Sequence, residues 1–219
     1  RISGGGRCNV THSCFVASDL VKFYPRGEKE LRGPFHTFGA NDTIEWFKNQ
    51  GVALKTESDG RMFPTTDSSQ TIIDCFLSAT AKFNIQVLTA QSVQSLFKKD
   101  DMWKVETKND QFICEKLVIA AGSNPKLWQM LKEFDHTIVP AVPSLFTFKI
   151  KDSRIKDLPG IASEAEVKVL GTKLTSSGPL LITHWGMSGP AILKLSAWGA
   201  RILAEKNYQF KIQVNWLAG

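Results

Sequence analysis

The sequence predicts an α/β protein that is mixed α+β in part, and three observations carry this prediction. Residues 117–122, Leu-Val-Ile-Ala-Ala-Gly, form a continuous apolar run ending in glycine, which is typical of a fully buried strand in a parallel sheet. Amphipathic helical patterns and short β-type segments alternate before this run. After Pro140 the pattern changes to β-type segments separated by prolines, so we place a domain boundary near residue 140.

Turn residues and helix caps divide residues 1–140 into short elements. A loop is expected over 4–17, and only short helices fit 18–38, which contain several prolines and glycines. The capped helices expected next are Asp42–Gln50, with Asn41 as the cap, and a helix from Asp67 or Ser68 to about Lys82. The strands expected here are Val52–Thr56, Arg61–Phe63, Ile85–Leu88, Ser92–Lys98, Trp103–Thr107, Gln111–Cys114 and Leu117–Gly122. Turns are expected at Ser58-Asp59-Gly60 and Asn109-Asp110, and a short helix over 126–134.

Residues 141–219 predict β-type segments around one helix. Ser188 is expected to cap a helix that continues to about Glu205, with Pro190 tolerated in its first turn. The strands expected here are Leu145–Lys151, Glu166–Leu170, Pro179–Trp185 and Tyr208–Val214.

Charge and cysteine content indicate which kind of ligand and which cellular compartment to expect. The net charge is +6, but the lysines are scattered, so no nucleic-acid partner is expected and an anionic small molecule is the better match. Four irregularly spaced cysteines predict free thiols in a reducing cytoplasm. No apolar run reaches the roughly 18–20 residues of a membrane span, and no signal peptide is visible. The chain lacks an initiator Met, and both ends are expected to be edges of a longer protein.

The first candidate site is the segment Ser3–Asn9, which contains three consecutive glycines. Glycines let a backbone approach a ligand closely and point several N–H groups into one concavity, and Arg7 adds a bidentate donor. This chemistry suits a pyrophosphate or the polar edge of a flavin, and the alternative is a flexible linker. No Gly-Lys-Ser/Thr follows, which excludes a P-loop. Cys8, His12 and Cys14 lack the spacing of a fourth ligand, so no metal site is expected.

Two other segments could carry chemistry. The apolar run ends in Ala121-Gly122, and ligands in α/β sheets bind beyond the carboxyl ends of strands. Its alternative reading is a simple strand-to-helix turn. In residues 183–190, His184 and Trp185 precede an expected helix N-terminus. Histidine changes its protonation near neutral pH and tryptophan stacks on rings, while the alternative is a helix cap beside a buried aromatic residue.

Together these segments resemble a known family. Residues 2–11 closely resemble the "ISGGGRCNVTN" signature of bacterial NAD(P)/FAD-dependent oxidoreductases of the aminoacetone-oxidase-like or bile-acid-dehydroxylation type. Residues 60–66 are similar to the family's "GR.FP.S" stretch, and residues 178–193 to its "GPLLxTHxGxSGPAxL" stretch. The order and spacing agree, and the likeness covers essentially the whole chain.

The resemblance implies a two-dinucleotide-binding flavoprotein. Residues 1–140 would be part of the FAD-binding domain, and residues 141–219 would begin an inserted β-barrel-like domain. FAD would be the cofactor, with NAD(P)H as a possible electron donor. In the family the glycine-rich loop lies beside FAD, Val93 would lie near the adenine, and the His184 loop would face the flavin, which makes His184 a weak catalytic candidate. The implied cofactor-binding residues are Gly4, Gly5, Gly6, Arg7, Cys8, Asn9, Val93, Ala121 and Gly122.

Two departures from the family pattern limit what is implied. The family's G-x-G-x-x-G segment precedes its glycine-arginine motif and is not in this sequence, so the isolated chain is expected to be inactive. Residues 121–128 also lack the family's second glycine-rich loop. The expected function is an FAD-dependent oxidoreductase acting on a small molecule. The alternative is a non-catalytic module that binds a nucleotide or a partner.

Overall fold

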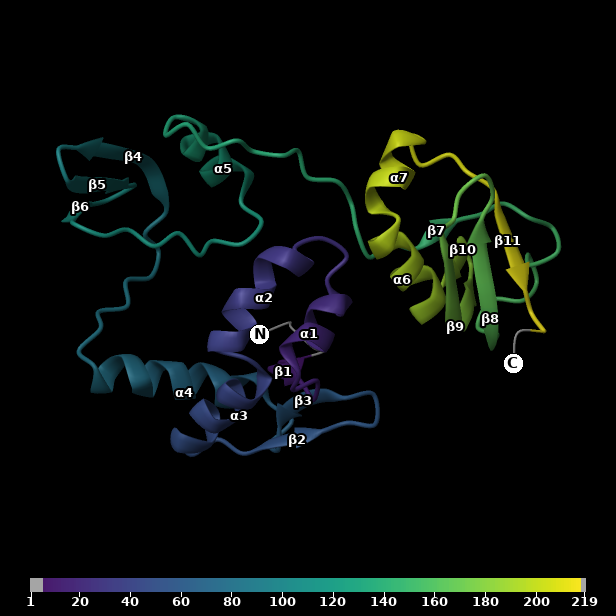
Figure 1. The fold of residues 1–219 in the computed structure, drawn as a ribbon, viewed down its shortest axis with the longest axis horizontal. Helices are drawn as coiled ribbons and strands as arrows, with labels where there is room; N and C mark the ends of the chain where they lie inside the picture. The colour runs from purple at the N-terminus through teal and green to yellow at the C-terminus, as the bar shows by residue number, and fades with distance from the viewer. Residues whose placement is uncertain (1–5, 218–219) are drawn as a thin grey trace. The chain divides into compact units, whose positions relative to one another are not determined.

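The computed structural model describes residues 6–217, and the chain divides into two compact units, Arg1–Ile138 and Val139–Gly219 (Figure 1). Two three-stranded sheets belong to the first unit and one five-stranded sheet to the second. Helices accompany the sheets in both units, so the predicted mixed α/β class is confirmed. Every strand pairing in the described residues is antiparallel.

The first sheet has the order β1-β3-β2, with β1 at Thr11–His12, β3 at Arg61–Pro64 and β2 at Leu54–Thr56. Helices α3 (Ala40–Asn49) and α4 (Ser69–Lys82) accompany it (Figure 1). Apolar residues from both helices and the segment before β2 form its core; they are Phe47, Val52, Ile72 and Cys75. The predicted hairpin between β2 and β3 is confirmed.

In the first unit, helix capping agrees with the prediction at one of two positions. The Ser68 hydroxyl accepts a hydrogen bond from the Gln70 N–H at 3.3 Å, so the predicted cap of α4 is confirmed. The prediction that Asn41 caps α3 is wrong. The Asp42 carboxylate instead accepts from the Gly39 N–H at 2.7 Å, which starts the helix at Ala40.

Short helices precede α3, as expected. They are α1 (Ala17–Leu20), the 3₁₀ turn η2 (Val21–Phe23) and α2 (Glu28–Thr37). Pro34 lies inside α2 rather than ending it.

The second sheet of the first unit has the order β4-β5-β6, with β4 at Val93–Lys99, β5 at Met102–Thr107 and β6 at Gln111–Cys114. All three strands and the Asn109-Asp110 turn were predicted and are confirmed; the Thr107 N–H donates to the Asp110 carbonyl at 2.8 Å. Helix α5 (Pro125–Lys132) contributes Met130 to the core beside this sheet.

Two predicted strands are wrong. Residues 85–88 and 117–122 are irregular, and Val118 is 87% exposed. An apolar run is a buried strand only where other strands pair with it on both sides. No strand in residues 6–217 pairs with residues 117–122, so the predicted parallel strand does not form in this part of the chain.

The second unit is built on one curled sheet with the order β11-β8-β9-β10-β7 (Figure 1). The strands are β7 (Phe148–Lys149), β8 (Ala162–Val169), β9 (Thr175–Thr183), β10 (Gly186–Ser188) and β11 (Ile212–Asn215). Strands were predicted at the positions of β7, β8, β9 and β11. The observed β7 and β11 are shorter than predicted, while β8 and β9 form one long hairpin.

One predicted helix of the second unit is divided into two. Helix α6 (Pro190–Trp198) begins at a Gly189 cap rather than at Ser188, which ends β10. Gly199 separates it from α7 (Ala200–Glu205). A Cβ atom on Gly199 would lie 2.9 Å from the Leu195 carbonyl oxygen, so the backbone packs too closely here for a side chain. Pro190 occupies the first turn of α6, as predicted.

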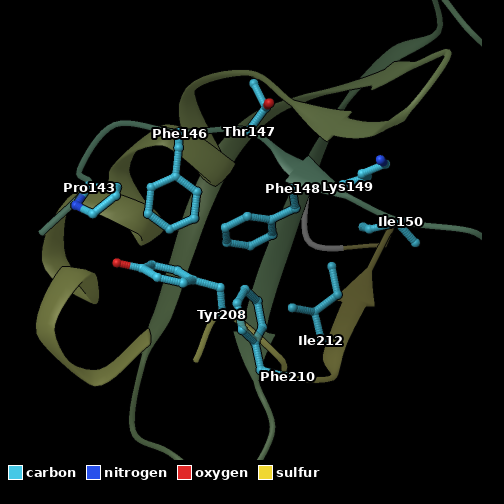
Figure 2. A pocket seen from close by; sticks show the side chains of 9 residues that line it. All are labelled: Pro143, Phe146, Thr147, Phe148, Lys149, Ile150, Tyr208, Phe210 and Ile212. Atoms are coloured by element: carbon cyan, nitrogen blue, oxygen red, sulfur yellow. The ribbon is translucent and has the colours of Figure 1, made fainter. Parts of the chain in front are cut away.

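The two outer strands of the curled sheet meet through side chains. The Phe148 ring of β7 lies 5.0 Å from the Phe210 ring, which precedes β11, and Phe146 lies 5.8 Å from Tyr208. Figure 2 shows these four rings around a pocket of about 360 Å³. The core of the unit lies between the sheet and α6 and includes Val167, Leu180, Ile192 and Leu195, each of which is almost completely buried.

Candidate functional site

The loop Gly6–Asn9 enters β1 through two residues with left-handed backbone. Gly6 has φ of 88° and Cys8 has φ of 63°, which is uncommon for a residue with a side chain. Cys8 packs against the core formed by Phe47 and Ile72. The predicted site residues Gly4 and Gly5 lie outside the described residues.

Arg7 is held by an arrangement that we call the Arg7 clamp, formed by Arg7, Glu57, Phe63 and Asp67. The guanidinium donates to the Glu57 carboxylate, lies 3.7 Å from an Asp67 carboxylate oxygen and stacks on the Phe63 ring at 4.1 Å. The Glu57 hydrogen bond raises the pKa of Arg7, and a hydrogen bond from Lys55 lowers the pKa of Asp67. The N–H donors of Arg7, which were expected to face a cofactor phosphate, thus point to two carboxylates. The clamp joins the loop to the β2–β3 hairpin.

Gly60 sets the distance between this hairpin and β1. A Cβ atom there would lie 2.6 Å from the His12 ring, and φ is 84°. The His12 Nε2 atom lies 3.1 Å from the Asp59 carbonyl oxygen. The stretch Gly60–Pro64 therefore has two structural roles: a tight turn against His12 and the fully buried Phe63 that supports Arg7.

A pocket of about 440 Å³ opens beside the loop, within the usual range for small-molecule sites. Its walls are largely aromatic, and the Trp46 and Phe76 rings lie 5.4 Å apart with an interplanar angle of 30°. A second hollow of about 420 Å³ shares four of its residues. The residues that line the first pocket are Cys8, Asn9, Val10, Phe38, Thr43, Trp46, Phe47, Ile72 and Phe76.

The donor set of this pocket fits the ring end of a flavin. Flat apolar walls from Trp46 and Phe38 suit a planar ring system. Asn9 and Thr43 provide an amide and a hydroxyl, which suit the polar ring edge. The aromatic part of this site was not predicted, because Trp46 and Phe76 lie on different helices and only the fold brings them together.

The other predicted cofactor residues lie elsewhere in the first unit. Val93 begins β4 and packs in the apolar cluster of Leu96 and Val105, a different cluster from that of Cys8. Ala121 and Gly122 lie in the irregular exposed segment, where Gly122 has φ of 58°. The structure therefore brings Cys8 and Asn9 into one pocket beside the Arg7 clamp, and Val93, Ala121 and Gly122 do not line that pocket.

His184 lies at the tip of a hairpin in the second unit. Thr183 pairs with Gly186, so His184 and Trp185 form the two-residue turn between β9 and β10, and both are exposed. A Cβ atom on Gly186 would lie 2.2 Å from the Phe148 carbonyl oxygen. The glycines of this motif are explained by strand packing. The expected position of His184 just before a helix is corrected, because β10 intervenes.

Comparison with known proteins places the chain in the class of Rossmann-domain proteins. Residues 1–199 match the sequence model of the HI0933-like protein Rossmann domain, and the chain belongs to this family, which is part of the FAD-dependent oxidoreductase superfamily. No helix in residues 6–217 is long and apolar enough to cross a membrane. All four cysteines are free, as predicted.

Three relatives match most of the chain. A 3-dehydro-bile acid delta(4,6)-reductase of Clostridium scindens is 23% identical, and the match covers 98% of this chain and 54% of the reductase. Ribosomal RNA dihydrouridine synthases of Escherichia coli and Haemophilus influenzae are 27% and 25% identical, over 90% and 89% of this chain and 51% of each relative. The chain spans about half the length of these relatives.

Proposed function

We propose that this chain carries part of the flavin site of an FAD-dependent reductase. The observation that carries the proposal is the aromatic pocket beside Cys8 and Asn9, on a loop that the Arg7 clamp holds in place. Family membership over residues 1–199 supports the same cofactor. A bound flavin supplies hydride transfer, and NAD(P)H is the proposed electron donor.

The chain's own residues would bind and orient the ring end of the cofactor. Trp46 and Phe38 exclude water from its faces, while Asn9 and Thr43 offer hydrogen bonds to its edge. The Arg7 clamp acts indirectly, because its charges are satisfied within the protein. Its role is to fix the backbone of Cys8 and Asn9 against the hairpin.

The relatives suggest a reaction type. One is named a delta(4,6)-reductase and two are named dihydrouridine synthases, and both names describe hydrogen addition to a ring carbon–carbon double bond. We propose the same type here: a hydride equivalent adds to one carbon of a double bond conjugated to a carbonyl group, and a proton adds to its neighbour. His184 stays the proposed catalytic candidate only because its segment, residues 178–193, resembles the family motif.

The visible spectrum of the purified full-length protein tests the cofactor. We expect flavin absorption after reconstitution with FAD, and bleaching on anaerobic addition of NAD(P)H. A colourless protein that takes up no FAD would refute the proposal. Flavin binding without NAD(P)H-driven bleaching would instead support the non-catalytic binding module.

A further inference from the structure

We propose that the second hollow of the first unit, which we call the His12 hollow, is the subsite of the reductase's substrate, and that His12 is the catalytic residue that protonates this substrate. The inference rests on the proposed function, which puts the flavin ring in the neighbouring aromatic pocket. Its physical basis is separate: a ring nitrogen of His12 that the described chain leaves without a hydrogen-bond partner.

The His12 hollow adjoins the aromatic pocket directly. It has a volume of about 420 Å³, and the two spaces share Asn9, Val10, Phe38 and Thr43. Hydride transfer needs reacting atoms about 3–3.5 Å apart, so a substrate has to lie against the ring that occupies the aromatic pocket. The His12 hollow meets this requirement and has the size of a small-molecule site.

The lining of both spaces lacks permanently charged side chains. No Lys, Arg, Asp or Glu is among the residues that line either one. Burial of an unpaired charge is costly, so the part of a substrate that enters is uncharged. The Tyr24 and Phe35 rings, 5.5 Å apart, add apolar wall to the hollow. The hollow therefore suits an uncharged conjugated carbonyl compound, although the net charge of the whole chain suggested an anion.

His12 is held in this lining by contacts on two sides. Its ring lies 5.6 Å from the Phe23 ring, and a Cβ atom on Gly60 would lie 2.6 Å from it. The Nε2 atom lies 3.1 Å from the Asp59 carbonyl oxygen, which can only accept a hydrogen bond. Nε2 therefore carries a hydrogen atom in both the neutral and the protonated ring.

The other ring nitrogen, Nδ1, has an unmet hydrogen bond. It is buried and has no partner within residues 6–217. Because Nε2 keeps its hydrogen, the proton that the ring gains and loses is the one on Nδ1. A buried polar atom without a partner costs free energy, and a substrate bound in the hollow that His12 lines supplies that partner.

The reaction balances with His12 as the acid. The carbon–carbon double bond is reduced: a hydride equivalent that originates from NAD(P)H forms one C–H bond, and the proton leaving Nδ1 forms the other, at the carbon beside the carbonyl group. NAD(P)H is oxidised to NAD(P)⁺, and the neutral imidazole regains a proton from water that enters as the product leaves. Imidazole suits this role because it exchanges protons near neutral pH. The hydroxyl of Tyr24, which also lines the hollow, is the rival acid.

Reoxidation of the FAD-reconstituted full-length protein, reduced with NAD(P)H under anaerobic conditions, tests this role by its visible absorption. We expect cyclohexenone to reoxidise the wild type, and His12→Gln to slow this step about 100-fold, since a general acid contributes roughly 10²–10⁴. The glutamine amide can still donate to the Asp59 carbonyl but has no proton to give. Ferricyanide, which takes electrons without protonation of a carbon, should reoxidise both proteins at the same rate. His36→Gln, at an exposed position, is the matched control and should change neither rate.

NMR of the oxidised protein with isotope-labelled histidine nitrogens gives a readout that needs no turnover. We expect the neutral His12 ring to carry its hydrogen on Nε2, and the Nδ1 signal to move when cyclohexenone is added. The His12→Gln variant identifies these signals by their loss. Cyclohexene carboxylate, which places a charge on the same ring, should bind at least about ten-fold more weakly than cyclohexenone.

The failures of the two proposals are distinguishable. A protein that binds FAD and is reduced by NAD(P)H, yet is reoxidised by cyclohexenone equally fast in His12→Gln, would overturn this inference and leave the proposed cofactor intact. A wild type that cyclohexenone does not reoxidise would also overturn it, as would a loss confined to Tyr24→Phe or His184→Gln.

Three further results would contradict the inference. They are a hydrogen atom on Nδ1 of the neutral His12 ring, tighter binding of the carboxylate than of the enone, and an equal slowing of the ferricyanide reaction in His12→Gln, which would show a structural role alone. Thermal unfolding of each variant confirms that a slower reaction is not a loss of fold. A protein that takes up no FAD would refute the proposed function and this inference with it.

Discussion

The guanidinium carbon of Arg7 lies 4.1 Å from the centre of the Phe63 ring, which is fully buried. A residue that the sequence suggested as a phosphate ligand is thus a joint between the cofactor loop and the central strand of a sheet. The joint has two parts, the ring below and the carboxylates of Glu57 and Asp67 around it. Each part can be tested separately.

The Arg7 guanidinium is not expected to contact the cofactor, but its removal should still weaken cofactor binding because it fixes the loop. We expect Arg7→Ala to raise the Kd for FAD about ten-fold. Arg7→Lys should recover only part of the lost affinity, since lysine keeps the charge but not the planar stacking group. Titration of the apoprotein by flavin fluorescence quenching measures this. Arg32→Ala, at an exposed position on α2, is the control, and an equal effect there would contradict the role of the clamp.

The aromatic wall of the pocket should determine how tightly the flavin ring is held. We expect Trp46→Ala to weaken FAD binding at least about ten-fold, because a stacked ring face is lost. Trp198→Ala removes an exposed tryptophan of the second unit and should leave FAD affinity unchanged. If Trp46→Ala binds FAD as tightly as the wild type, the flavin ring does not occupy this pocket.

Gly60→Ala should destabilise the fold more than Gly51→Ala does. Both glycines have positive φ, so each alanine costs about 1 kcal/mol of backbone strain. Only at Gly60 would the added Cβ meet another group, the His12 ring at 2.6 Å. We expect an additional loss of about 1–2 kcal/mol in the free energy of unfolding there, measured by urea denaturation. Equal losses at the two positions would show that His12 moves aside freely.

Acid should weaken the loop around Asp152. Its folded-state pKa is about 2, below the roughly 3.9 of an unfolded aspartate, so its stabilising contribution is present above about pH 4 and is lost as the pH falls toward 2. Asp152→Asn should remove this part of the acid dependence. The midpoint temperature of thermal unfolding should then fall less steeply as the pH is lowered. Added salt should reduce the difference, since the Arg154 pair is exposed. An unchanged profile in Asp152→Asn, matching that of Asp157→Asn, would contradict this assignment.

Local sequence patterns correctly predicted those turns and helix caps whose geometry depends only on neighbouring residues. The Asn109-Asp110 turn and the Ser68 cap formed where their chemistry predicted. The run 117–122 failed because burial of a strand depends on neighbouring strands, which a local pattern does not contain. The prediction that Asn41 caps the helix was wrong because the neighbouring Asp42 carboxylate accepts a hydrogen bond from the Gly39 N–H, which starts the helix earlier.

The candidate site also has a part that the sequence predicted and a part that only the fold brings together. The loop Gly6–Asn9 was recognisable from its composition and from its resemblance to a family. Glu57 and Asp67 were not, because they meet Arg7 only after β2 and β3 pair and bring distant residues to one edge.

The contact at Gly186 restricts how this protein can be altered. Its backbone runs so close to the Phe148 carbonyl that any side chain would separate the edge strand from the hairpin. The two tip positions, His184 and Trp185, carry no such restriction, because both are exposed and neither is left-handed. Variants that test the proposed role of the tip should therefore change His184 or Trp185 and keep the flanking glycine fixed.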